Sequence, residues 1–250
     1  MSLQTKLALS LLVLISFISS CTTIPQSTSD RESRLLIEKS FGNGITLEFY
    51  FEKGKRHNHP SFAVWIESLE GELIQTIFVT QSVATGYYAY GDAGDGSWLK
   101  VPGPAARPAS LPYWLHRREI GVAGQLPDPD NPLPDAYTGA TPPASFNMLA
   151  ETKESLPDRF KVLTEVNQPW DWNRYWTNDK YENEAEYRTS AQPALIYAVE
   201  VDLNEPQNIY YLNPIGHSHY SGADGKHYSN LKTFTTALEI FESITLKIKK

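Results

Sequence analysis

The chain has 250 residues, of which 22 are Lys or Arg and 29 are Asp or Glu, so its formal net charge at pH 7 is −7. An acidic chain without a basic stripe is poorly suited to the phosphate backbone, and we therefore expect no nucleic-acid partner. The single cysteine, Cys21, excludes both an intramolecular disulfide framework and a zinc site built from several cysteines.

The first 21 residues resemble a bacterial lipoprotein signal. A short segment with one lysine precedes the apolar run L-A-L-S-L-L-V-L-I-S-F-I, which is too short for a membrane-spanning helix. The last residue of this run and the three that follow, Ile18 to Cys21 or I-S-S-C, resemble a lipobox, which implies that residues 1–20 are removed and that Cys21 carries a lipid. The alternative is an ordinary secretory signal with a chance cysteine. We expect a protein of the bacterial cell envelope, anchored to the lipid bilayer and facing the periplasm or the exterior.

Residues 21–33 are polar and carry no core pattern, so we expect a flexible tether there. The remaining residues, 34–250, are expected to form a single domain, since all-β sandwiches reach this length. Apolar and polar residues alternate, or β-branched and aromatic residues gather, in eight segments. These predicted strands are 45–52, 62–68, 73–80, 111–117, 160–167, 194–203, 208–212 and 238–248.

The spacing of these strands predicts an all-β fold, namely an immunoglobulin-like β-sandwich. Residues 69–72 are expected to form a turn around Gly71. Residues 81–90 fit either a helix or a strand and turn. Residues 91–145 are rich in Gly and Pro, and we expect a long irregular insertion, of a kind that is usually functional or disordered.

Within this insertion, residues 135–141 read D-A-Y-T-G-A-T and are followed by two prolines. One interpretation is a turn that ends a strand, and the other is an attachment site. The order matches the flavinylation motif Asp-x-x-Ser/Thr-Gly-Ala-Thr, in which a flavin transferase joins FMN to the last threonine through a phosphoester bond. The matching positions are Asp135, Thr138, Gly139, Ala140 and Thr141. The match implies a flavin transferase as partner and Thr141 as the FMN acceptor.

The residue types suit an acceptor. Thr141 supplies a hydroxyl that can attack phosphorus, and the small residues before it leave room for a transferase. Gly139 is expected to take a positive φ in a tight turn, and Asp135 can fix that turn through its side chain. No His or Lys adjoins Thr141 in the sequence, as expected if the general base and Mg²⁺ belong to the transferase.

Most of the chain resembles a family of predicted periplasmic proteins of unknown function. The likeness covers about residues 45–248 and includes, in order, F-A-V-W-I-E-S-L-E-G-E-L-I-Q-T-I, L-P-Y-W, P-D-A-Y-T-G-A-T-P-P-A-S-F and T-E-V-N. The resemblance implies covalent flavinylation and extracytosolic electron transfer with a membrane redox partner, often near iron acquisition systems. The chain departs from the family after Phe146, where it reads N-M-L-A-E-T-K-E-S-L instead of a W-D-G-x-D-D-x-G turn.

Aromatic side chains are candidates for contact with the flavin ring, which needs flat apolar faces and a few polar groups. Tyr113 and Trp114, expected on the strand before the motif, and Tyr137 within it are the first candidates, with core packing as the alternative. For the run P-W-D-W-N-R-Y-W at residues 169–176, we expect a loop that covers one end of the sandwich. Candidates to balance the phosphate charge are Arg117, Arg118 and Lys153.

Histidines offer a different site. His217 and His219 occur as H-S-H with His227 nearby, and His57 and His59 occur as H-N-H. Residues i and i+2 of a strand share a face, so either pair could bind copper or zinc. The alternative is a set of loop histidines that bond to backbone groups.

Two classes of function remain. The first is a lipid-anchored carrier with covalent FMN that passes electrons outside the cytoplasm, an electron-transfer flavoprotein rather than a stand-alone enzyme. The second is a non-enzymatic cell-envelope binding or assembly module, whose aromatic loop holds a glycan, a peptide or a metal ion. The acceptor threonine separates the two, since a binding module has no need of it.

Overall fold

The computed structural model describes residues 35–40, 42, 44–94, 97–119, 126–133, 138–153 and 156–249, and of residues 35–40 it describes the backbone alone. These residues belong to one compact unit, Ser33–Lys250. The predicted signal segment with Cys21, the tether, Asp135 and Tyr137 lie outside the described residues.

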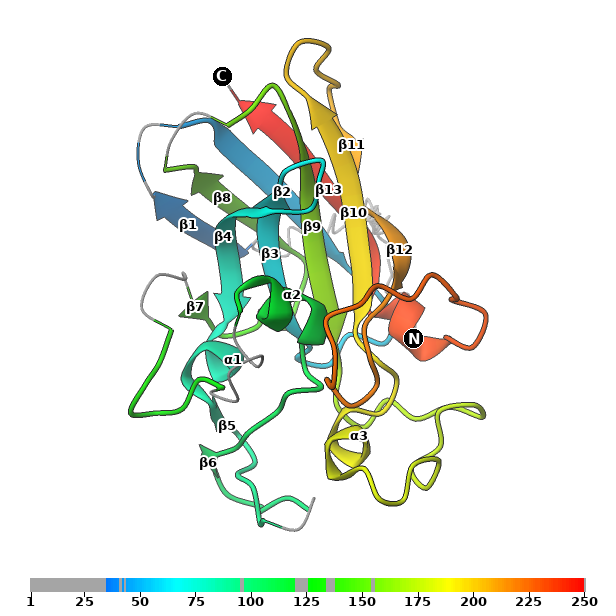
Figure 1. Ribbon diagram of the computed structural model, residues 1–250. Helices are drawn as coiled ribbons and strands as arrows, with labels where there is room; N and C mark the ends of the chain where they lie inside the picture. The colour runs from blue at the N-terminus through cyan, green and yellow to red at the C-terminus, as the bar shows by residue number, and fades with distance from the viewer. Residues whose placement is uncertain are drawn as a thin grey trace, which may run out of the picture. The chain divides into compact units, whose positions relative to one another are not determined.

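Two β-sheets pack against each other around the main core (Figure 1), which confirms the predicted all-β sandwich. The five-stranded sheet has the order β1 (Leu35–Ser40), β8 (Phe146–Glu151), β2 (Thr46–Lys53), β13 (Phe241–Lys249) and β11 (Tyr210–Tyr211). The six-stranded sheet has the order β12 (Asn213–His217), β10 (Leu195–Asp202), β9 (Arg159–Asn167), β3 (Ser61–Glu67), β4 (Leu73–Thr80) and β7 (Thr138–Gly139). A small sheet pairs β5 (Tyr87–Tyr88) with β6 (Gly103–Pro104). The immunoglobulin-like strand order stays a prediction.

The five-stranded sheet buries alternate residues, as a strand with one solvent-facing side requires. On β2 the buried residues are Leu47, Phe49 and Phe51, and the residues between them are partly exposed. The Phe51 ring stacks on Phe146 of the neighbouring β8 with centroids 4.7 Å apart, and it lies 5.4 Å from Phe62 of the opposite sheet. Rings from both sheets therefore form the centre of the sandwich.

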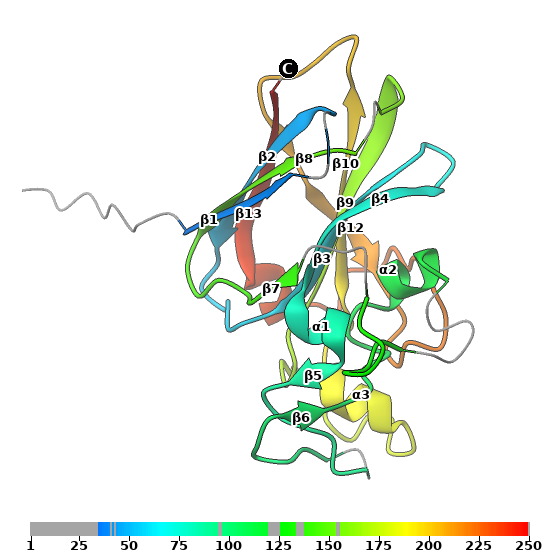
Figure 2. The same cartoon turned by 90° about the vertical axis from the view of Figure 1, so that its left-hand side faces the viewer.

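The six-stranded sheet is buried on both faces around β3, where all seven residues are buried. Phe62 and Val64 belong to the main core, whereas Ala63 and Trp65 belong to a second core on the outer face. Helix α2 (Pro112–Arg117) covers that outer face, on the side away from the five-stranded sheet (Figure 2). This two-sided burial explains the unbroken apolar run of β3.

The prediction of a strand over residues 111–117 is wrong, because Pro112–Arg117 form the helix α2. A proline at the first helical position has a backbone angle suited to a helix. The amides of Tyr113 and Trp114 donate to the carboxylate of Glu165 on β9. The segment P-Y-W-L is rich in aromatic residues, which is typical of strands. Glu165, which accepts from the amides at the helix N-terminus, comes 52 residues after Tyr113 and 51 residues after Trp114 in the chain.

Residues 81–90 combine the two predicted alternatives, since the helix α1 (Gln81–Thr85) is followed by β5. Between residues 91 and 145, the described part of the chain has only β6, α2 and β7 as named regular elements, so the insertion is largely irregular, as predicted. In the described ranges, no helix is long and apolar enough to cross a membrane. Elements that the sequence analysis did not predict are β1, β6, β7, β8, β12, α3 (Ala185–Ser190) and a 3₁₀ helix at Thr236–Glu239.

Helix α1 with β5, β6 and α3 lies beyond one end of the two sheets, and β7 lies beside α1 (Figures 1 and 2). The residues of the flavinylation motif that the structure describes are therefore at the end of the sandwich that carries the irregular insertion.

Candidate functional site

The described part of the motif begins at the edge of the six-stranded sheet. Thr138 and Gly139 form β7, which pairs in parallel with the end of β4, with Thr138 opposite Val79 and Gly139 opposite Thr80. Gly139 does not have a positive φ, so the prediction of a tight glycine turn is wrong. A Cβ at Gly139 would lie 3.5 Å from the ring of Phe78. The glycine packs its backbone against the core instead of reversing the chain.

Thr141 follows β7 and is partly exposed. Its hydroxyl donates a hydrogen bond of 2.6 Å to the carbonyl oxygen of Pro60, the last residue of the connection between β2 and β3. A hydroxyl that donates its hydrogen still has two acceptor lone pairs. The Thr141 hydroxyl is therefore held in one orientation, and the lone pairs of its oxygen are available for another bond.

Two further contacts hold the prolines after Thr141. The ring Nε2 of the buried His57 donates to the carbonyl oxygen of Pro142 at 2.8 Å, and the Nζ of Lys53 donates to the carbonyl oxygen of Pro143 at 2.8 Å. Burial lowers the pKa of His57, which favours the neutral ring. Prolines lack an amide hydrogen and cannot donate the backbone hydrogen bonds of a sheet. The side chains of Lys53 on β2 and His57 in the following loop hold this segment through its carbonyl oxygens instead.

Thr141 lines a cleft with a volume of about 550 Å³, which we call the aromatic cleft. Its lining residues are Asn58, His59, Ser61, Ser82, Tyr88, Ala89, Tyr90, Trp98, Arg107, Ala140, Thr141, Pro169 and Trp170. They come from five separate stretches of the chain, and four of them are Tyr or Trp. A volume of several hundred Å³ with aromatic walls is typical of a small-molecule site.

Arg107 is the lining residue of the aromatic cleft that carries a full positive charge. Its guanidinium carbon lies 3.7 Å from the ring centroids of both Tyr88 and Trp98, and its Nη2 donates to the carbonyl oxygen of Tyr90 at 2.9 Å. Burial lowers the pKa of Arg107 to about 10, so the group stays protonated at neutral pH. The two cation–π contacts fix this charge in the wall of the cleft.

Trp170 and Tyr90 form the exposed rim of the aromatic cleft. Their rings meet edge to face with centroids 5.2 Å apart, and they are 48% and 42% exposed. Trp170 has a φ of +63°, and His59 in the same cleft has a φ of +52°. A positive φ costs energy for residues other than glycine and often marks a functional site. The strained backbone therefore points to the same cleft as the motif.

Thr141 also lines a second cleft, of about 510 Å³. The lining residues of this second cleft are Thr80, Gln81, Ser82, Thr85, Tyr87, Pro129, Pro132, Gly139, Ala140 and Thr141. Tyr87 is the aromatic residue among them and is 48% exposed. The two clefts are similar in volume and differ in chemistry.

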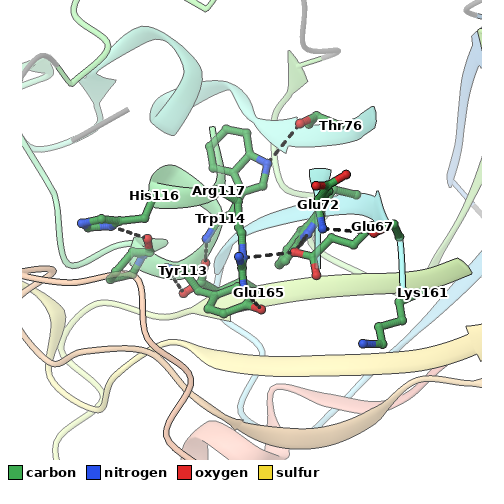
Figure 3. A network of polar contacts seen from close by, with 12 residues as sticks. Glu67, Glu72, Thr76, Tyr113, Trp114, His116, Arg117, Lys161 and Glu165 are labelled. Atoms are coloured by element: carbon green, nitrogen blue, oxygen red, sulfur yellow. Dashed lines mark hydrogen bonds and ion pairs between the residues drawn. The ribbon is translucent and has the colours of Figure 1, made fainter. Parts of the chain in front are cut away.

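Trp114, a predicted flavin contact, is separated from this site. It lies on α2 and is fully buried in the second core, where its Nε1 donates to the Oγ1 of Thr76 at 3.2 Å (Figure 3). It lines neither of the clefts that Thr141 lines. A side chain without exposed surface cannot contact a ligand, so the structure favours core packing.

Glu165 of β9 lies under the N-terminus of α2 (Figure 3). Its carboxylate oxygens accept from the amides of Tyr113 at 3.1 Å and of Trp114 at 2.8 Å. Burial raises the pKa of Glu165 to about 8, although both amides favour the charged form. This carboxylate satisfies two helix amides that would otherwise lack a partner.

Arg117 was a candidate to balance the phosphate, but its Nε lies 3.4 Å from Glu67 and its Nη2 donates to the Tyr113 hydroxyl at 2.7 Å (Figure 3). Glu67 is 2% exposed and also accepts from the Nε1 of Trp65 at 2.8 Å. Burial raises the pKa of Glu67. The candidates that line neither of the two clefts are Arg117, Arg118 and Lys153. Arg107 lines the aromatic cleft together with Thr141.

The rings of His217, His219 and His227 bond to nearby backbone. His217 and His227 contact carbonyl oxygens at 2.8 and 3.0 Å, and His219 accepts from a backbone amide at 3.2 Å. Burial lowers the pKa of His217. In the part of the chain that the structure describes, no group of three or more His, Cys, Asp or Glu could hold a metal ion. These contacts favour the alternative of histidines that bond to backbone groups, with His217 at the end of β12, and the metal site stays a prediction.

The aromatic run at residues 169–176 divides between two places. Trp170 is at the rim of the aromatic cleft, whereas Trp176 is 5% exposed and packs in the main core with Phe234, at a centroid distance of 5.8 Å. Tyr175 beside it is 49% exposed. The structure thus places two residues of the run, Pro169 and Trp170, in the lining of the cleft that Thr141 also lines.

Among the aromatic and cationic residues of the aromatic cleft, the sequence analysis missed Tyr88, Tyr90, Trp98 and Arg107. A signal was present, since residues 87–98 contain four Tyr or Trp among several glycines and lack a strand pattern. Aromatic residues in such a segment have no regular element to bury them, so they pack on one another or on a ligand.

No family model, curated protein or solved structure matches this chain. The fold and the site define its class: an all-β sandwich that presents a threonine hydroxyl between two clefts, one of them aromatic and positively charged.

Proposed function

We propose that the protein is a lipid-anchored, extracytosolic electron carrier with FMN attached to Thr141. The observation that carries the proposal is the position of the Thr141 hydroxyl, which is oriented by Pro60 and lines the aromatic cleft beside the charge of Arg107. A flavin attached there would find flat rings and a cation within reach of its tether. Cys21 would hold the carrier in the cell envelope, where a membrane redox partner, in a system linked to iron acquisition, would exchange electrons with it.

The attachment step is a transfer from FAD by a separate Mg²⁺-dependent flavin transferase. The Oγ of Thr141 attacks the FMN phosphorus, the phosphoanhydride bond of FAD breaks and AMP leaves. The hydroxyl proton passes to a base of the transferase, so the hydrogen bond to the Pro60 carbonyl cannot persist in the product. Losing one hydrogen bond of this kind costs about 1 kcal/mol, which the new phosphoester and its contacts can offset.

The location of the described part of the motif, residues 138–141, supports access by a transferase. β7 is at the edge of its sheet, and Ala140 is exposed. An edge strand offers unpaired backbone groups to another chain. The transferase can therefore approach residues 138–141 without unfolding the sandwich.

The test is co-expression with an active flavin transferase, followed by intact mass and in-gel flavin fluorescence. The wild type should gain the mass of one FMN. Thr141→Val keeps the shape but removes the nucleophile, so it should gain none. Thr138→Ser is the matched control and should be modified, because either hydroxyl residue satisfies that position. A wild type that stays unmodified beside an active transferase would contradict the proposal.

A second candidate function is a non-enzymatic binding module of the cell envelope. A separate cleft of about 440 Å³ supports it, with the exposed ring of Tyr175 beside Trp176, Tyr220 and Asn230. Exposed aromatic faces with neighbouring amides suit a glycan. This reading predicts that an unmodified protein changes its tryptophan fluorescence when soluble glycans are titrated, and that Thr141→Val has no effect on that change.

A further inference from the structure

An FMN tethered to Thr141 has two clefts within reach, because both share Thr141, Ala140 and Ser82 in their linings. We propose that its isoalloxazine ring lies in the aromatic cleft, against Trp170 and Tyr90, and not in the second cleft. This inference rests on the proposed attachment to Thr141 and concerns where the attached group then lies.

Volume does not decide between the clefts, since about 550 and about 510 Å³ are both sufficient for a tricyclic ring. The side chains that line the two clefts differ, and this difference favours the aromatic cleft. A flat, electron-poor ring gains most from stacking on electron-rich aromatic faces. Tyr90 and Trp170 meet edge to face and are both partly exposed, so they form a corner with open apolar surface. Among its described lining residues, the second cleft has one aromatic side chain, Tyr87, which stands among threonines and prolines.

Charge favours the same cleft. The phosphodiester keeps one negative charge, and the ring carries two carbonyl oxygens. Arg107 lines the aromatic cleft and is held there by Tyr88 and Trp98, with centroid distances of 3.7 Å, whereas the described lining of the second cleft has no Lys or Arg. A fixed cation in a partly desolvated wall attracts an anionic group more strongly than a mobile surface lysine does.

The backbone supplies a third, independent argument. Four non-glycine residues with positive φ are found among the described residues, and two of them, His59 and Trp170, line the aromatic cleft. None lines the second cleft. The φ of +63° sets where the Trp170 ring stands, and such strain persists where surrounding structure over-determines it. The strained backbone therefore singles out the aromatic cleft and not the second cleft.

The experiment compares Trp170→Ala with Tyr87→Ala. Both residues are 48% exposed, and each contributes aromatic surface to one cleft only. Each variant is co-expressed with an active flavin transferase, and intact mass first establishes how much flavin is attached. Flavin fluorescence per attached flavin is then measured, because a stacked Trp or Tyr quenches an excited flavin by electron transfer.

The wild type should be strongly quenched, and Trp170→Ala should raise the fluorescence per flavin several-fold while Tyr87→Ala leaves it unchanged. A rise in Tyr87→Ala without a rise in Trp170→Ala would place the ring in the second cleft and overturn the inference. Wild-type fluorescence equal to that of free FMN would also overturn it, since the ring would then lie in solvent. Absence of flavin from the wild type would refute attachment itself, and intact mass reports this outcome separately.

A second variant guards against misfolding of Trp170→Ala. Tyr90→Leu removes the other ring of the rim and leaves the backbone carbonyl that binds Arg107 in place. It should also raise the fluorescence per flavin. If both rim variants carry full flavin with unchanged fluorescence, the aromatic cleft does not hold the ring.

Discussion

Replacing Glu165 with Gln tests the electrostatics of the contact that positions α2. In the folded protein the carboxyl is fully buried and its pKa is raised from 4.5 to about 8 by the loss of hydration. Between these two pKa values Glu165 is protonated in the folded protein but ionised in the unfolded chain. The free energy of unfolding is therefore highest below the pKa of the unfolded state, and it falls as the pH rises up to and through the pKa of the folded state.

The magnitude follows from the two pKa values. With about 8 for the folded state and 4.5 for the unfolded state, the linkage relation gives a loss of about 2 kcal/mol of unfolding free energy between roughly pH 6 and pH 8. Glu165→Gln cannot ionise, so it should lack this loss. Its amide group would place an N–H₂ against one helix amide, but that cost is the same at both pH values and cancels in the comparison.

The assay is denaturant unfolding of both proteins at the two pH values and constant ionic strength. His57 and His217 also have shifted pKa values, yet they are present in both proteins and their effects subtract out. The wild type should lose about 2 kcal/mol more than the variant on going to the higher pH. Equal losses in the two proteins would show that Glu165 is already ionised at pH 6 and would refute the reasoning from burial.

Two further predictions concern the acceptor segment and the anchor. His57→Ala removes the donor to the Pro142 carbonyl and should cost about 1–3 kcal/mol, with faster amide hydrogen exchange at residues 138–141; unchanged exchange there would mean that this contact does not hold the acceptor. Cys21→Ala should release the protein from membranes, as measured by fractionation with a carbonate wash, and a variant that stays with the membrane would contradict the lipobox interpretation.

The sandwich could be predicted from the sequence because its strands carry local signals. Apolar and polar residues alternate along β2. The turn at Gly71, which has a φ of +91°, connects β3 to β4. The helix α2 could not be recognised in the same way. Its N-terminal amides are satisfied by Glu165, which lies on a strand that follows much later in the chain. A local pattern cannot report a partner that only the fold brings close.

The candidate site was only partly foreseeable for a similar reason. The order of residues singled out Thr141 as the candidate attachment site, which stays a prediction. The expected glycine turn was wrong because Gly139 is extended beside β4 and packs on Phe78. Trp114 was expected near the acceptor and lies in the second core. Which aromatic residues surround a site depends on how loops meet at the end of the sheets, and no spacing in the sequence encodes that.

The walls of the aromatic cleft come from residues 58–61, 82–90, 98–107, 140–141 and 169–170. Under the proposed attachment, the heptapeptide D-A-Y-T-G-A-T moved into another protein would carry its threonine hydroxyl with it. It would leave behind the aromatic rings, the buried guanidinium of Arg107 and the histidine that bonds to Pro142. We therefore expect a flavin attached in the new protein to be open to oxygen and solvent, without the surroundings that would control its reactivity here.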